Sequence, residues 1–316
     1  MNEEEKVVKG LKELLNKFMP EFEYLNQLVE SFELVHKNKL LDKNFVSRCV
    51  DENTLKDRLA EIILAKKCYA IFGDDVSSKN KGPDITIKFE GKVINIECIR
   101  PNKEALKKTG NFTVFNFSPD KRENVTYTVQ DEYVDTPEFC LHIGGRVLTK
   151  TKKYQEYLDK GTIKKTDINI VCVNIGFNEK IDSILISELK RLFYGMPFIC
   201  LESDSENNVG IKIKAHIEDR PCTYYKDFDV GKPIETATFS IGNDSDFYRI
   251  IDGVIILNKN NTHELGCQIS NDEVIFVNLN GKGIPDEFIK RMGLKTGREI
   301  DPEDYTITKI RECGYM

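Results

Sequence analysis

Residues 84–99 constrain the fold of this chain more than any other segment, because they hold two alternating apolar runs only two residues apart. The alternating apolar residues are, in order, Ile85, Ile87, Phe89, Ile94, Ile96 and Cys98. Alternation of this kind is typical of half-buried strands. Glu90-Gly91 between the runs is short enough for a two-residue turn. The segment therefore predicts an antiparallel hairpin.

The length of this turn predicts which residues face each other across the hairpin. A two-residue turn pairs Phe89 with Lys92 and, further along, Asp84 with Glu97, whose β-carbons would lie about 5 Å apart. A slip of one residue would turn these side chains to opposite faces. Like charges directly opposite each other are destabilising unless a cation neutralises them. Magnesium is the natural candidate, because proteins often hold it with one or two carboxylates plus waters and phosphate oxygens.

Helical periodicity precedes the hairpin. Residues 3–36 carry apolar residues at helical spacing with a break at Pro20, which predicts an N-terminal helical layer. A more apolar helix is expected from Thr54 to Phe72, with Thr54 as its N-cap and Gly73 at its end. Its wide apolar surface predicts burial on most sides.

The segment after the hairpin is harder to interpret. Residues 100–145 are polar and lack periodicity, so we expect a long loop that is functional or mobile. A helix is predicted at 146–158, ending near Gly161, and a buried strand at 167–175. Further expected elements are a helix near 182–193, strands at 198–201, 210–216, 254–257 and 274–279, and a short helix at 288–292.

Composition and motifs exclude several classes of protein. The net charge of -6 argues against a generally basic surface, although a local basic patch is compatible with it. Nine cysteines stand singly, which predicts reduced buried thiols in a cytoplasmic protein and argues against a disulfide or zinc framework. No apolar run is long enough to cross a membrane, and the acidic start does not resemble a secretory signal. The sequence also lacks the P-loop and G-x-S-x-G motifs.

The acidic residues resemble the pattern of the PD-(D/E)xK nuclease superfamily. Gly82-Pro83-Asp84 precedes the first strand, Glu97 lies near the end of the second, and Glu61 lies upstream on the apolar helix. The resemblance covers about residues 54–175. It implies that Asp84 and Glu97 hold Mg²⁺ or Mn²⁺, with Glu61 as an outer or second-metal ligand.

The resemblance also implies a fold. The expected fold is α/β, with a restriction-endonuclease-like α-β-β-β-α-β core and a mixed sheet. N-terminal helices (1–45) would precede the core (46–204), and a strand-rich C-terminal extension (205–316) would follow it. The composition boundary near 205 is weak, so one continuous domain is the alternative.

One position departs from the family pattern. The superfamily usually has a lysine two residues after the second acid, but this chain has Ile99 there, and the neighbouring Arg100 would point to the opposite face of a strand. Some members carry the lysine elsewhere, including on the neighbouring helix. Arg146, Lys150 and Lys153 share one face of the predicted helix 146–158. We expect Lys150 or Lys153 to supply the missing ammonium group, and the sequence does not choose between them.

The expected activity is metal-dependent hydrolysis of phosphodiester bonds in nucleic acid, with DNA as the expected substrate. Metal activates water and polarises the phosphoryl group, and a nearby lysine stabilises the developing charge. Restriction, defence and repair are the contexts that the resemblance suggests. It also allows a homodimer, because many members cut both strands as dimers.

Further basic residues are candidates for phosphate contacts. Residues 146–165 contain seven basic and two acidic residues, a local excess that could bind nucleic acid or could be a solvated helix face. The candidate contacts are Arg100, Lys103, Arg146 and Lys152. Tyr154 and Tyr157 could stack on bases, but core packing is the simpler interpretation.

Two rivals to the nuclease hypothesis remain open. The first is a binding module with the same fold, catalytically degenerate at Ile99, that holds nucleic acid or a protein partner. The second is a structural or interaction protein without any role on nucleic acid. A nuclease requires Asp84 and Glu97 for activity, whereas DNA binding by a degenerate module would survive their removal.

Overall fold

The computed structural model describes the central sheet, the helices on both of its faces and several hairpins. The described residues are 3–42, 45–78, 81–101, 108–117, 124–133, 136–176, 189, 192–193, 198–204, 212–218, 225–226, 233–234, 250–258, 273–278 and 281–296. The helices are α1 (Glu3–Phe18), α2 (Leu25–Lys37), α3 (Glu52–Phe72), α4 (Thr136–Asp159) and α6 (Asp286–Arg291), with short 3₁₀ turns at Val46–Arg48 and Gly73–Asp75.

Over these described residues, the main sheet has seven strands in the order β1-β2-β3-β6-β11-β12-β13. Their bounds are β1 (Val76–Ser77), β2 (Ile85–Phe89), β3 (Lys92–Ile99), β6 (Ile168–Asn174), β11 (Gly253–Leu257), β12 (Val274–Val277) and β13 (Lys295–Thr296). The β3–β6, β6–β11 and β12–β13 pairs are parallel, and the others are antiparallel. The protein is thus a mixed α/β fold with N-terminal helices. Because β11–β13 extend the same sheet, the boundary predicted near 205 does not divide it.

The hairpin of β2 and β3 has the predicted register. Ile85 pairs with Ile96 and Phe89 pairs with Lys92. Both turn residues have positive φ, 48° at Glu90 and 74° at Gly91, as a type I′ turn requires. The two-residue turn therefore fixes the pairing on which the prediction for Asp84 and Glu97 depended.

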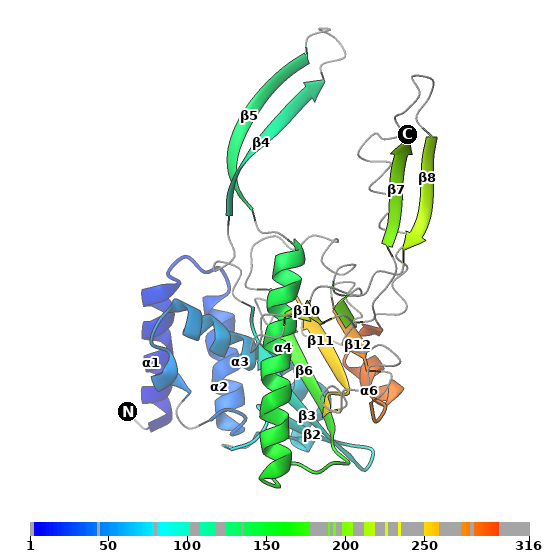
Figure 1. Cartoon of the computed structure of the whole chain (residues 1–316). Coiled ribbons are helices and arrows are strands. Elements are labelled where there is room, and N and C mark those ends of the chain that lie inside the picture. Colours follow the sequence, from blue (N-terminus) through cyan, green and yellow to red (C-terminus); the bar gives the residue numbers. More distant parts are fainter. Residues whose placement is uncertain are drawn as a thin grey trace.

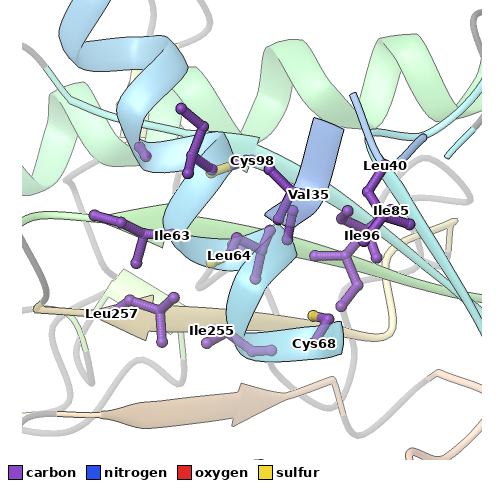
Figure 2. Packing of buried hydrophobic residues seen from close by; sticks show 14 of the residues in the cluster. Val35, Leu40, Ile63, Leu64, Cys68, Ile85, Ile96, Cys98, Ile255 and Leu257 are labelled. Carbon is purple, nitrogen blue, oxygen red and sulfur yellow. The ribbon is translucent and has the colours of Figure 1, made fainter. Parts of the chain in front are cut away.

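Helices cover both faces of the sheet (Figure 1). Alternation along β3 directs Ile96 and Cys98 into one core with α1–α3, whereas Ile99 enters a second core with α4. Figure 2 shows the first core, where Ile63 and Leu64 of α3 pack over the sheet. Both helical layers are thus fixed against the strand that carries Glu97.

Helix α3 begins earlier than its predicted cap. The N-cap is Asp51, and Thr54 is the N3 residue of a capping box. The Thr54 amide donates to Asp51 Oδ1 at 2.8 Å, and the Asp51 amide donates to Thr54 Oγ1 at 3.0 Å. The prediction of Thr54 as N-cap was wrong because either a hydroxyl or a carboxylate can cap, and the sequence offers both within one turn. Gly73 ends the helix, as predicted.

The prediction of one long loop at 100–145 was wrong. Strands β4 (Lys108–Phe117) and β5 (Asn124–Tyr133) form a long antiparallel ribbon, and α4 starts at Thr136, well before the predicted helix. The early part of α4 lacks a clear sequence signal because Gly144 and Gly145 lower its helix propensity. Pro137 lies in the first turn of α4, where a missing amide hydrogen costs nothing.

Other expected elements agree with the structure. The break at Pro20 separates α1 from α2, and β6, β11, β12 and α6 lie where strands and a helix were predicted. Residues 198–201 and 210–216 fall largely within β7 (Phe198–Asp204) and β8 (Lys212–Glu218), which pair with each other, as do β9 (Tyr225–Lys226) and β10 (Pro233–Ile234). Most of the helix predicted at 182–193 lies outside the described residues. Within the described part of the chain, no helix is long and apolar enough to cross a membrane. Cys49, Cys68, Cys98, Cys140 and Cys172 have buried side chains, as the sequence predicted.

Candidate functional site

The β2–β3 hairpin brings Asp84 and Glu97 together at one end of the sheet. Asp84 directly precedes β2, and its Oδ2 atom accepts a hydrogen bond of 2.8 Å from the Cys98 amide on β3. Glu97 is fully buried. The strand–turn–strand order of the hairpin is therefore sufficient to place Asp84, just before β2, beside Glu97 near the end of β3.

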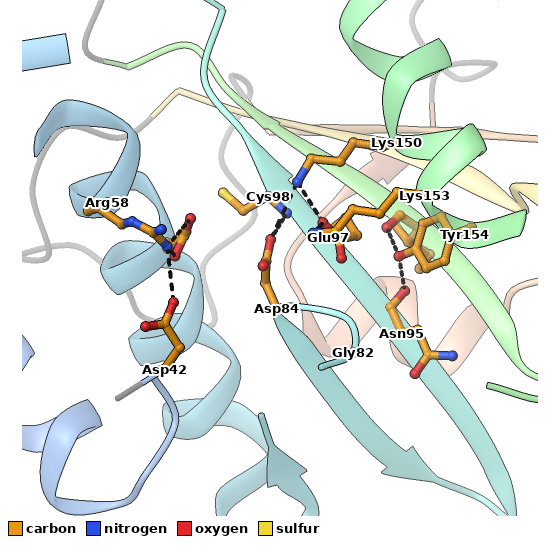
Figure 3. Close-up of polar contacts among 12 residues, drawn as sticks. Asp42, Arg58, Gly82, Asp84, Asn95, Glu97, Cys98, Lys150, Lys153 and Tyr154 are labelled. Atoms are coloured by element: carbon orange, nitrogen blue, oxygen red, sulfur yellow. Dashed lines mark hydrogen bonds and ion pairs between the residues drawn. The ribbon is translucent and has the colours of Figure 1, made fainter. Parts of the chain in front are cut away.

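Helix α4 supplies two ammonium groups to these carboxylates (Figure 3). Lys150 Nζ lies 2.5 Å from Glu97 Oε2, and Lys153 Nζ lies 2.8 Å from the same atom. Lys150 Nζ is also 3.8 Å from Asp84 Oδ2. Because one ammonium group reaches both acids, their carboxyl groups lie closer than the roughly 8 Å beyond which one ion could not be shared. Both lysines predicted as alternatives thus contact Glu97.

Tyr157 completes the surroundings of Glu97. Its hydroxyl lies 2.9 Å from Glu97 Oε1 and 2.8 Å from the Gly82 carbonyl oxygen. Residues 150, 153 and 157 follow helical spacing, so a single face of α4 holds Glu97 from three positions. The sequence pattern predicted only packing or stacking for Tyr157. Its spacing from Lys153 was the signal that could have revealed the contact with Glu97.

Tyr154, the neighbour of Lys153 on α4, belongs to the core. Its ring is buried, and its hydroxyl lies 3.0 Å from the Asn95 carbonyl oxygen and 2.7 Å from that of Ile170. These two carbonyl groups belong to the adjacent strands β3 and β6, so the hydroxyl ties α4 to both strands. The core interpretation of Tyr154 is thus confirmed.

Burial and neighbouring charges together shift the pKa values of the groups in this cluster. Burial, and then the neighbouring Asp84 carboxylate, raise the pKa of Glu97, although Lys150 and Lys153 oppose that shift. Burial alone would lower the pKa of Lys150, but Asp84 and Glu97 outweigh it, so this pKa is raised. Lys150 therefore stays charged between the two acids. A cation at that position relieves the repulsion that the sequence predicted.

Glu61 approaches this cluster from the other helical layer, on α3. Arg58 NH1 donates to both of its carboxylate oxygens, at 2.7 and 3.0 Å. Burial, followed by the charge of Asp84, raises the pKa of Glu61 to about 8, with Arg58 opposing the shift. Glu61 thus lies within electrostatic reach of Asp84 but has an arginine as its direct partner.

Asp84, Glu61, Lys150 and Lys153 line a cavity of about 790 Å³, a size typical of ligand sites. It runs from the segment before α3, past Asp84, to the C-terminal half of α4. Its charged lining residues are Arg48, Arg58, Lys81, Lys150, Lys153 and Lys160 among the bases, and Asp42, Glu61 and Asp84 among the acids. In a chain of net charge -6, this local excess of positive charge favours an anionic ligand.

The residues predicted to contact nucleic acid lie in different places. Arg100 is buried, and its guanidinium donates to Asp57 at 2.9 Å and to Asn53, so it is already engaged within the fold. Arg146 and Lys152 are exposed on α4. Lys103 lies outside the described residues. Of the predicted residues that the structure describes, Arg146 and Lys152 are those at the surface.

The donor set at Asp84 and Glu97 fits a divalent cation in chemistry, since it offers two carboxylates around a place that already attracts positive charge. Mg²⁺ commonly uses one or two protein carboxylates and takes its other ligands from water and phosphate. Over the residues that the structure describes, no three His, Cys, Asp or Glu side chains lie close enough to hold a metal together. Asp84, Glu97 and Glu61 are therefore not assembled as a set of three ligands.

No family model matches the chain, and no curated protein or solved structure matches it either. The geometry of the cluster around Glu97 is therefore the basis for any functional conclusion.

Proposed function

We propose that this protein hydrolyses phosphodiester bonds in nucleic acid, with DNA as the expected substrate, in a reaction that depends on Mg²⁺ or Mn²⁺. The observation that carries the proposal is the position of Lys150, whose ammonium group lies 2.5 Å from Glu97 and 3.8 Å from Asp84. This is the charge that Ile99 cannot supply. A lysine from α4 thus stands in for the lysine that the PD-(D/E)xK pattern has on the strand.

The order of elements supports the same superfamily fold. Helix α3 is followed by β1, β2 and β3, then by α4 and β6, with the β4–β5 ribbon inserted before α4. This is the α-β-β-β-α-β order that the resemblance implies, and β3 and β6 are adjacent and parallel. The restriction-endonuclease-like core is therefore part of the proposal.

The residues would divide the chemistry as follows. Asp84 and Glu97 would hold the cation, which when bound activates water and polarises the phosphoryl group. Lys150 would orient the attacking water and stabilise negative charge that develops on the phosphoryl oxygens. Lys153, whose side chain is 39% exposed, would contact a phosphate at the cavity edge.

A second candidate is a binding module without catalysis. Complete burial of Glu97, with two lysines on one oxygen and Tyr157 near the other, favours it, because this carboxylate is already well satisfied. The two candidates differ in one respect. Catalysis requires the lysines to make room for a cation, whereas binding does not.

The test is cleavage of supercoiled plasmid and of single-stranded DNA, with Mg²⁺ or Mn²⁺ compared with EDTA. Wild type is compared with Glu97→Gln, which keeps the shape of the side chain, and with Lys88→Ala, an exposed lysine on β2, as the control. The nuclease proposal expects metal-dependent nicking that Glu97→Gln abolishes and Lys88→Ala retains. DNA binding without nicking under either metal would favour the binding module.

A further inference from the structure

A second group of charges lines the cavity on the side away from α4. Arg48 NH1 and Arg58 NH1 lie 3.3 and 3.5 Å from a single oxygen, Oδ2 of Asp42. Two guanidinium groups thus converge on one anionic atom. Both contacts are long for a charge-assisted hydrogen bond, which is usually about 2.7–2.9 Å. Figure 3 shows Arg58 and Asp42 facing each other across from Asp84.

Arg58 is held in this orientation by the fold. It donates to Glu61 one turn along α3, and its guanidinium lies 5.3 Å from the centre of the Phe45 ring. Its side chain is only 17% exposed. Arg48 by contrast is 55% exposed, so it can turn toward a ligand in the cavity.

From this convergence we propose that Arg48 and Arg58 form a phosphate subsite. The carboxylate of Asp42 contacts both guanidinium groups and so partly occupies the position of the phosphate. The subsite would hold a phosphate of the nucleic-acid strand next to the one that is cut, and it therefore rests on the proposed function. Arginine suits this role because its planar donors match phosphate oxygens. Asp42 would act as an internal competitor for the incoming phosphate.

This arrangement predicts an effect opposite to that of a purely structural ion pair. Asp42→Asn removes the competing charge and keeps the side-chain shape, so DNA affinity should rise several-fold. Arg48→Ala should lower the affinity for DNA. It should also reduce the slope of log K against log[salt] by about one, as expected for one lost phosphate contact. In the double variant the gain from Asp42→Asn should be smaller than in the single variant, because Arg48 is then absent and only Arg58 remains to bind the phosphate.

The experiment measures binding of a fluorescein-labelled single-stranded DNA oligonucleotide by anisotropy in EDTA, so that no cleavage intervenes. Glu287→Gln is the matched control, because it removes one negative charge from an exposed ion pair with Arg291 on α6, away from the cavity. The proposal expects tighter binding for Asp42→Asn and unchanged binding for Glu287→Gln. Equal affinities of Asp42→Asn and Glu287→Gln, or wild-type affinity of Arg48→Ala, would overturn it.

The two proposals fail in different ways. If wild type binds and cuts DNA while Asp42→Asn and Arg48→Ala bind as wild type does, only the subsite is refuted. If wild type neither binds nor cuts DNA with any metal, the proposed function is refuted, and the subsite is refuted with it.

Discussion

Two lysine–glutamate pairs, each with a buried carboxylate, involve helices that cover opposite faces of the sheet. Lys67 of α3 contacts Glu273 at 2.6 Å, and Lys150 of α4 contacts Glu97 at 2.5 Å. The first pair is enclosed, with side chains 3% and 2% exposed. The second adjoins a cavity and includes a second carboxylate and a second lysine.

The difference shows why a buried ion pair alone is weak evidence for function. An enclosed pair can be replaced by apolar residues with little loss, so it is compatible with a purely structural role. Around Glu97 there are more charged groups than a single pair, because Lys153 and Asp84 lie beside Lys150 and Glu97. That excess next to a cavity is what distinguishes a candidate site from an internal contact.

The largest expected effect is on catalysis. Lys150→Ala should reduce the rate of DNA cleavage by about 10²–10³-fold, because it removes a charge that stabilises the transition state. Single-turnover cleavage of plasmid DNA measures this, with circular dichroism to verify folding. Lys67→Met serves as the comparison and should keep near-normal cleavage under conditions where it is folded. Equal losses in both variants would remove the distinction between the pairs.

The next effect is on stability. Lys67→Ala should lower the free energy of unfolding by about 3–5 kcal/mol, because it leaves Glu273 buried without its partner. The double replacement Lys67→Met with Glu273→Leu should restore most of this loss. Urea unfolding followed by circular dichroism measures both. A stable double variant that no longer cleaves DNA would show that the enclosed pair has a functional role after all.

A smaller effect should separate the two lysines near Glu97. Lys153 is 39% exposed and Lys150 18% exposed, so Lys153 is better placed to bind substrate than to act on water. Lys153→Ala should raise KM by about tenfold with a modest change in kcat, the pattern of lost ground-state binding. Steady-state cleavage of a labelled oligonucleotide gives both constants. A loss confined to kcat would reverse the two assignments.

The smallest effect concerns pH. The pKa of Glu61 rises to about 8 in the folded protein from 4.5, so the native state retains a proton that the unfolded chain releases. Stability should therefore fall as pH rises from about 4.5 to about 8. Glu61→Gln should remove about 1–2 kcal/mol of that fall, allowing for partial exposure of the side chain. Urea unfolding in EDTA at about pH 5 and about pH 8 measures the change in the free energy of unfolding between the two pH values. An equal change in wild type and in Glu61→Gln would contradict the prediction.

The sequence was most informative where local geometry decides the structure. Glu90-Gly91 favours a tight turn, so the register of β2 and β3 and the proximity of Asp84 to Glu97 could be predicted. Helical spacing likewise placed Lys150 and Lys153 on one face. The first prediction depends on the two residues of one turn and the second on one helical repeat, and in both the periodicity of side chains is strict.

Longer-range contacts could not be derived in this way. The partnership of Lys67 with Glu273 and the addition of β11–β13 to the sheet join residues far apart in the chain, which periodicity does not encode. The ribbon of β4 and β5 was missed because a polar segment without strong alternation resembles a loop. The orientation of Arg58 toward the cavity depends on the packing of Phe45 against it, a tertiary effect.

The two lysine–glutamate pairs also differ in the length of chain that separates the lysine from the glutamate. Glu97 and Lys150 are 53 residues apart, whereas Lys67 and Glu273 are 206 apart. Bringing together the ends of the longer segment costs about 1 kcal/mol more in chain entropy. We therefore expect the carboxylates and lysines of the candidate site to meet early in folding. The last strands would then close over Lys67, which stays hydrated until its partner arrives.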